Sequence, residues 1–230
     1  MEPFEANCPL PSTHQRCTEA QYFLEQSLPH YHSPQPFIHN LNAYIQTLRN
    51  ITFMLQSELS HRTDFGAWYD AKRAEMRSLL PLKRMVEARN TVVKQSSLAA
   101  HSKISCGLFR GRRMKLSMTK EIKPFTDTRV ILAATARFVG DIFLGGKHEQ
   151  VGEQAGVERT WVVDEIGEHE VIGECITALN YMYVLVDEAH RLCGTESGLR
   201  LVGYDLPTFF VLLESDVDPT LPAKWGWFGA

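Results

Sequence analysis

The type and position of Arg89 single it out as a residue that must have a partner. It follows Leu82 by seven residues and precedes Val93 by four, so helical pitch places it on the apolar stripe of a helix expected to begin near Pro81. A guanidinium keeps its charge and carries five donors, so burying it unpaired would cost a large free energy. We therefore predict that Arg89 pairs with an acidic side chain, lines a cleft or lies at a subunit interface.

A run of basic residues after position 109 is a second candidate site, because phosphate binding requires such positive charge. Only Glu121 opposes the run, and Phe109 beside it could stack on a base. The alternative is a solvated strand edge that its charges protect from pairing. The run consists of Arg110, Arg112, Arg113, Lys115, Lys120 and Lys123.

The charge is divided unevenly along the chain. Residues 1–123 hold 17 Lys and Arg against 10 Asp and Glu, whereas residues 124–230 hold 7 against 17. The basic half favours RNA or DNA as a partner, and the acidic half favours a protein partner. Two halves that pack on each other would account for the same asymmetry. The aromatic end, Trp225, Trp227 and Phe228, either contacts a partner or docks on the chain's own core.

Several well-known chemical motifs are absent from the sequence. It contains no G-x-x-x-x-G-K-[ST], G-x-G-x-x-G, G-x-S-x-G or H-E-x-x-H pattern. His30, His32 and His39 lie in a segment broken by prolines and without neighbouring carboxylates. We therefore predict no metal site and no cofactor.

Cysteine usage and hydropathy favour a cytoplasmic, water-soluble protein. The cysteines are odd in number and scattered, with no C-x-x-C pair, which argues against a disulfide framework or a thiolate zinc site. No signal peptide is recognisable, and no apolar run approaches the ~18 residues needed to cross a bilayer. The five cysteines are Cys8, Cys17, Cys106, Cys175 and Cys193.

The helices and strands expected from the sequence, which must position these residues, indicate an α+β fold that is mainly α. The clearest helix is 37–59, whose apolar stripe is wide enough for the centre of a bundle. Its narrow polar strip is a further site candidate. The alternative is that the strip only faces solvent. The strip consists of Asn42, Gln46, Arg49 and Asn50.

Other helices are predicted at 18–28, from Phe65, from Pro81 and at 168–193, where His190 lies on the inward stripe. Residues 104–118 favour strand or loop, and 130–139 fit either a buried strand or a short helix. The predicted organisation comprises a loose N-terminal arm, a helical bundle, an inserted β-rich or irregular segment and a C-terminal tail. Their bounds are 1–17, 18–95 plus 168–194, 96–167 and 195–230.

Three segments resemble bacterial HEPN-type bundles (higher eukaryotes and prokaryotes nucleotide-binding). They are residues 40–56, the run Phe65-Gly-Ala-Trp-Tyr and the run Ala88-Arg-Asn-Thr-Val-Val-Lys. That family carries an arginine, a polar residue, three variable residues and a histidine at the start of a late helix. Arg89 and Asn90 match the first two positions, and Lys94 stands in place of the histidine.

The resemblance implies a four- or five-helix bundle that dimerises and brings both motifs into one cleft. Many members are metal-independent ribonucleases of toxin–antitoxin and phage-defence systems, and others only bind RNA, nucleotides or proteins. A lysine has a pKa roughly four units above that of histidine, so Lys94 suits phosphate binding better than proton transfer. His190 would restore a proton shuttle if it reached Arg89.

The sequence therefore predicts a HEPN-like, nucleic-acid-directed homodimer that binds or regulates RNA rather than cutting it. Its candidate catalytic residues are Arg89, Asn90, Lys94 and His190; if it is an enzyme, it is a metal-independent endoribonuclease. The alternative is a catalytically inactive dimerisation or protein-interaction module. A third reading is a small-ligand enzyme with its pocket between the bundle and the inserted segment.

Overall fold

The computed structural model describes residues 8–95, 98–118, 123, 125–142 and 152–227. It has an α+β fold that is mainly helical, which confirms the predicted fold class. None of the described helices combines the length and the apolar character needed to cross a membrane.

The chain divides into two compact units. We call the first, Met1–Ser27 with Ile38–Ala100 and Val162–Gly203, the helical unit. We call the second, Leu28–Phe37 with His101–Trp161 and Tyr204–Ala230, the sheet unit.

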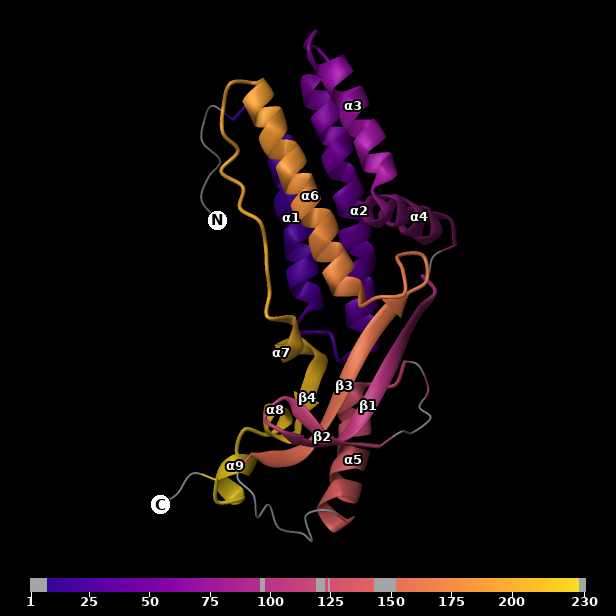
Figure 1. Cartoon of the computed structure of the whole chain (residues 1–230), viewed down its shortest axis with the longest axis vertical. Helices are drawn as coiled ribbons and strands as arrows, with labels where there is room; N and C mark the ends of the chain where they lie inside the picture. The colour runs from indigo at the N-terminus through magenta and orange to yellow at the C-terminus, as the bar shows by residue number, and fades with distance from the viewer. Residues whose placement is uncertain (1–7, 96–97, 119–122, 124, 143–151, 228–230) are drawn as a thin grey trace. The chain divides into compact units, whose positions relative to one another are not determined.

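The helical unit is a bundle in which α1, α2 and α6 run alongside one another (Figure 1). The apolar stripe predicted for α2 is confirmed, because its residues from Leu41 to Leu59 at helical spacing are at most 4% exposed. Tyr44 donates its hydroxyl to the Cys175 carbonyl at 2.6 Å and so ties α2 to α6. The helices of this unit are α1 (Pro11–Ser27), α2 (Pro34–Leu59, whose first turn belongs to the sheet unit), α3 (Phe65–Ser78), α4 (Leu80–Gln95) and α6 (Val171–Leu192).

The ends of these helices differ in places from the sequence expectation. The arm expected over 1–17 is shorter, because α1 begins at Pro11, where Glu58 accepts hydrogen bonds from the Ser12 and Thr13 amides. Asp64 stands at the N-cap of α3, but its carboxylate pairs with Arg62 instead of capping. Gly194 follows the last long helix with a φ of 76°, a conformation that glycine adopts readily at a helix end.

The inward stripe of α4 is rotated from the predicted one. Leu82, Met85 and Ala88 are buried, whereas Val86 and Val93 are 44% and 54% exposed. Buried residues three apart therefore define the packed face, and the predicted stripe was wrong in including Val93.

The sheet unit contains a four-stranded sheet in the order β2-β1-β3-β4, with β1–β2 and β3–β4 antiparallel. The ambiguous segment 130–139 lies within a helix, α5 (Thr128–Ile142). Its Ile131, Leu132 and Val139 pack with Cys106 and Leu108 of β1 in one apolar cluster. The first three strands are β1 (Ala100–Arg110), β2 (Arg113–Met118) and β3 (Glu153–Val163).

The segment expected to be a C-terminal tail supplies a strand and short helices instead. β4 pairs with β3 through the register Val157 to Leu212, and the carboxylate of Glu214 accepts the Ala155 amide at 2.9 Å. A strand of three buried residues is too short for a periodic pattern to reveal. The elements after residue 203 are α7 (Leu206–Phe210), β4 (Val211–Leu213), α8 (Glu214–Val217) and α9 (Leu221–Lys224).

Candidate functional site

A pocket of about 440 Å³ lies within the helical unit, formed by α2, α3 and α4 with Met182 of α6. Its volume falls in the range of small-ligand sites, roughly 300–1,000 Å³. Residues of α2 and α3 reach it at helical spacing, so that each helix presents one face. The apolar lining consists of Ile45, Leu48, Phe53, Tyr69, Met76, Leu82, Met85, Val86 and Met182.

Four cations and one carboxylate complete most of the polar lining of this pocket. Two cations are paired, Arg73 with Asp70 at 2.9 Å and Lys83 with Glu87 at 4.0 Å. The other two, Arg49 and Arg77, have no carboxylate within ion-pair distance among the described residues. The pocket therefore combines an apolar floor with an excess of positive charge.

Arg49 is held in place by its neighbours on α2. Its guanidinium lies 4.2 Å from the centre of the Phe53 ring and donates to the Thr52 hydroxyl. Such stacking restricts the side chain and leaves further N–H donors for a ligand. Arg49 belongs to the polar strip that the sequence offered as a site candidate, and it is the member that lines the pocket.

The described lining contains groups that bind but few that could move a proton. It includes no histidine or cysteine, and its carboxylate, Glu87, lies beside Lys83. A guanidinium stays charged near neutral pH and does not act as a general base. The arrangement is suited to holding an anion with an apolar or aromatic body.

The three α4 residues of the HEPN-like motif lie farther along the helix than the pocket residues. Arg89 is half-buried and donates to the Asn90 side chain at 3.4 Å, whereas Asn90 and Lys94 are exposed. None of the three belongs to the pocket lining. Arg89 therefore does not have the acidic partner that was one of its predicted roles, within the part of the chain described.

His190 is only 1% exposed, which confirms its predicted inward position. Its Nε2 atom lies 3.1 Å from Nε2 of His14. The structure therefore joins His190 to the first helix and not to Arg89, and the suggested proton shuttle between His190 and Arg89 is not formed.

Much of the predicted basic run is neutralised by carboxylates of the sheet unit. Arg112 forms a two-pronged ion pair with Asp216 at 2.9 and 3.0 Å. Arg110 and Lys115 both pair with Glu153, whose pKa is lowered chiefly by its hydrogen bond to Lys115. Burial explains why: Glu153 is 4% exposed and needs cationic partners.

The remaining members of the basic run contribute less to any surface that the structure describes. Arg113 and Lys123 are exposed, and Lys120 lies outside the described residues. The predicted nucleic-acid surface is therefore weaker in free charge than the sequence suggested.

A buried arginine was missed at the sequence level. Arg159 is 0% exposed, lies 4.2 Å over the Trp161 ring and donates to Thr126, Thr128 and Ser102. Burial lowers its pKa to about 10. Every second residue of a strand lies on the same face, and this spacing could have placed Arg159 inside. The residues of that face are all 0% exposed: Val157, Arg159, Trp161 and Val163.

The fold and the pocket define a mainly helical α+β protein with a pocket lined by cations in its bundle. Residues 2–203 match the family model described as Bacteriophage lambda protein ea47, and the chain therefore belongs to this family. It is 29% identical over 94 residues to Protein ea47 of Escherichia phage lambda.

That match covers 40% of this chain and 23% of the phage protein, so it spans less than a quarter of its relative's length. No solved structure matches the chain. The resemblance to HEPN-type bundles stays a prediction.

Proposed function

We propose that this protein binds single-stranded RNA through the pocket of its helical unit and does not cleave it. The observation that carries the proposal is the pair of guanidiniums of Arg49 and Arg77 over an apolar floor, for which the described residues supply no carboxylate partner. Guanidiniums bind phosphate through parallel N–H donors, and the aromatic floor offers a face for a base.

The HEPN-like motif extends this proposal along α4. Asn90 and Lys94 are exposed on the same helix as Lys83 of the pocket, so a strand longer than one nucleotide would have further polar contacts. In this proposal Lys94 neutralises a phosphate and does not transfer a proton. The role is therefore RNA binding or regulation rather than ribonuclease activity.

The proposed setting is the cytoplasm of a prokaryotic host, in a phage-defence or toxin–antitoxin context. The description of the family by a bacteriophage protein supports the prokaryotic host. All five cysteines are free thiols, which suits a reducing compartment.

The direct test is fluorescence anisotropy with a labelled single-stranded RNA at several salt concentrations. Arg77→Ala should weaken binding about tenfold. The slope of log affinity against log salt concentration should become shallower by about one, the contribution of one phosphate contact. Arg191→Ala is the matched control, because Arg191 is an exposed arginine of α6 outside the pocket. No binding by the wild type at low salt, or equal losses in both variants, would refute the proposal.

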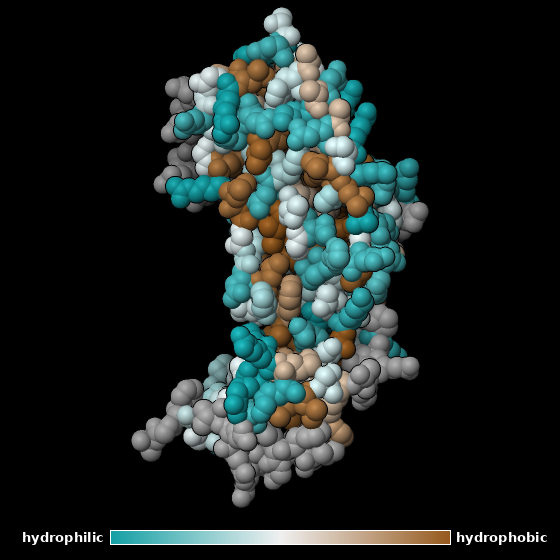
Figure 2. Space-filling model, viewed as in Figure 1, coloured by the Kyte–Doolittle hydropathy of each residue, from teal (hydrophilic) through white to brown (hydrophobic). Residues whose placement is uncertain are grey.

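Exposed apolar residues favour a second candidate, a dimerisation or protein-interaction module. Leu80, Val86 and Val93 of α4 are 53%, 44% and 54% exposed. On the face shown in Figure 2, hydrophobic residues also gather in a strip along the helices of the helical unit. Such patches mark contact surfaces when they are contiguous.

Light scattering during gel filtration tests the second candidate. A homodimer that becomes monomeric in Val93→Lys would support it, while circular dichroism checks that the variant remains folded. A monomeric wild type at high protein concentration would exclude self-association as the function.

A further inference from the structure

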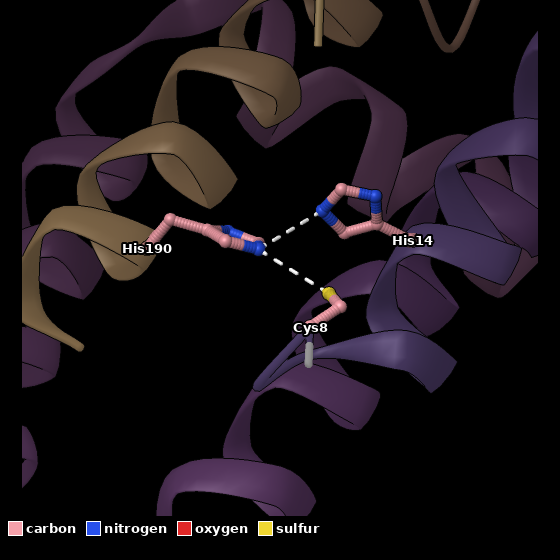
Figure 3. Close-up of side chains that lie close together, drawn as sticks. All are labelled: Cys8, His14 and His190. Atoms are coloured by element: carbon pink, nitrogen blue, oxygen red, sulfur yellow. Dashed lines mark hydrogen bonds between the residues drawn. The ribbon is translucent and has the colours of Figure 1, made fainter. Parts of the chain in front are cut away.

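We propose that Cys8, His14 and His190 form a binding site for a divalent transition-metal ion of the zinc type. Figure 3 shows the three side chains converging from separate parts of the helical unit. Cys8 precedes α1, His14 lies in the first turn of α1, and His190 lies in the last turn of α6. The site would join the start of the described chain to α6, and it was not predicted from the sequence.

The distances between ligand atoms suit a tetrahedral ion. The two Nε2 atoms of His14 and His190 are 3.1 Å apart, and Sγ of Cys8 is 3.5 Å from Nε2 of His190. Zinc bonds of ~2.0–2.1 Å to nitrogen and ~2.3 Å to sulfur imply separations of roughly 3.3 and 3.6 Å at tetrahedral angles. All three ligand atoms lie within 4.8 Å of one another, so Sγ of Cys8 and Nε2 of His14 would approach each other by at most about 1.2 Å around a tetrahedral ion.

The ring orientation of His190 is fixed by its second nitrogen. Nδ1 lies 2.9 Å from the Val186 carbonyl oxygen, which can only accept, so Nδ1 carries the proton. Nε2 then presents a lone pair toward His14 and Cys8 when the ring is neutral. A backbone acceptor behind a histidine is the usual arrangement around ligating imidazoles, because it fixes the tautomer.

The positions of His14 and Cys8 are also restricted by their surroundings. His14 is only 5% exposed, and its ring lies edge-on to the ring of His190 with 4.7 Å between the ring centres. The Leu10 amide donates to Sγ of Cys8 at 3.4 Å, which restricts the position of the sulfur. Both side chains therefore already lie close to Nε2 of His190, at 3.1 Å for Nε2 of His14 and 3.5 Å for Sγ of Cys8.

The backbone around His14 is held by Glu58 of α2. Its carboxylate accepts the amides of Ser12 and Thr13 at 2.8 and 3.0 Å and the Thr13 hydroxyl at 2.6 Å. This fixes the first turn of α1 and so the position of His14 relative to α2. One thiolate and two imidazoles suit zinc, and three protein ligands leave the fourth tetrahedral position for water.

The test uses the full chain and titration with Co²⁺, whose thiolate charge-transfer and tetrahedral d–d absorption report the ligands. The wild type should bind one equivalent with both kinds of band, and Zn²⁺ should displace them and raise the melting temperature. Cys8→Ser should lose the charge-transfer band and bind at least tenfold more weakly. Cys106→Ser, a buried cysteine of the sheet unit, is the matched control and should behave as the wild type.

A second variant guards against misfolding. His190→Gln should lose the metal-induced rise in melting temperature while circular dichroism shows an unchanged helix content. Binding of less than half an equivalent by the wild type, or intact cobalt bands in Cys8→Ser, would overturn the site. RNA binding is measured separately, so failure of either proposal is recognised independently of the other.

Discussion

At the scale of single residues, partners decide which charges are available for function. Arg112 is occupied by Asp216 and Arg110 by Glu153, whereas Arg49 stacks on Phe53 within the pocket. Counting basic residues along the sequence therefore overstated the free charge of the basic run, because the sheet brings Glu153 to residues far from it in sequence.

Arg159 is expected to be a major contributor to the stability of the sheet unit. Replacing it with Met removes three charge-assisted hydrogen bonds and the stacking on Trp161, so we expect a loss of about 3 kcal/mol in the free energy of unfolding. Urea denaturation followed by circular dichroism measures this. Arg113→Met, at an exposed position of β2, should change stability by less than about 0.5 kcal/mol.

His32 should make stability depend on pH. Burial lowers its pKa to about 4, so between about pH 4 and 6.5 the unfolded chain binds a proton that the native chain does not. The free energy of unfolding should therefore fall on acidification through this window, by about 1.4 kcal/mol per pH unit for this residue.

Urea midpoints at pH 7, 6 and 5 test this prediction. His32→Gln should flatten the slope but not abolish it, because the pKa of His14 is lowered to the same value. A slope unchanged from that of the wild type would show that the pKa of His32 is not lowered in the native protein. His61→Gln, at an exposed position, is the control.

At the scale of elements, the sequence predicted helices better than strands. The predicted helices at 37–59 and 168–193 correspond to α2 and α6. A long apolar stripe at helical spacing indicates an amphipathic helix and not a strand. The segment 130–139 was ambiguous because its apolar run is too short for its period to be read. β4 was not predicted, since its three residues form an element only through pairing with β3.

The candidate pocket could be predicted only in part for the same reason. Arg49 was marked by its place on a narrow polar strip of a mostly buried helix. Arg77 was not, because an arginine near the end of an amphipathic helix has no distinguishing pattern. The approach of α3 and α4 to α2, which makes the pocket, is tertiary structure that no local pattern encodes.

Two glycine substitutions test the pairing of β1 with β2. A Cβ at Gly107 of β1 would overlap the Leu116 carbonyl oxygen of β2, so Gly107→Ala should destabilise the hairpin by more than about 2 kcal/mol. Gly66→Ala in α3 has open space and should instead stabilise by about 0.5–1 kcal/mol. Thermal melting of both variants gives the comparison, and equal melting temperatures would contradict the β1–β2 register.

At the scale of the whole molecule, the match to the ea47 family and the helical unit end at the same residue. The family model covers residues 2–203, and the last segment of the helical unit ends at Gly203. The pocket and the Cys8–His14–His190 cluster both lie in the helical unit. We therefore expect the proposed functions to depend on this unit more than on α7, β4, α8 and α9.

The most direct test of the central claim is to map where RNA contacts the protein. Single-stranded RNA that carries 4-thiouridine is crosslinked to the full chain by ultraviolet light, and the modified peptides are identified by mass spectrometry. We predict crosslinks to the α2 and α3 segments that carry Phe53 and Tyr69. Crosslinks confined to β1 and β2, or none above those of a protein without RNA affinity, would contradict binding in the pocket.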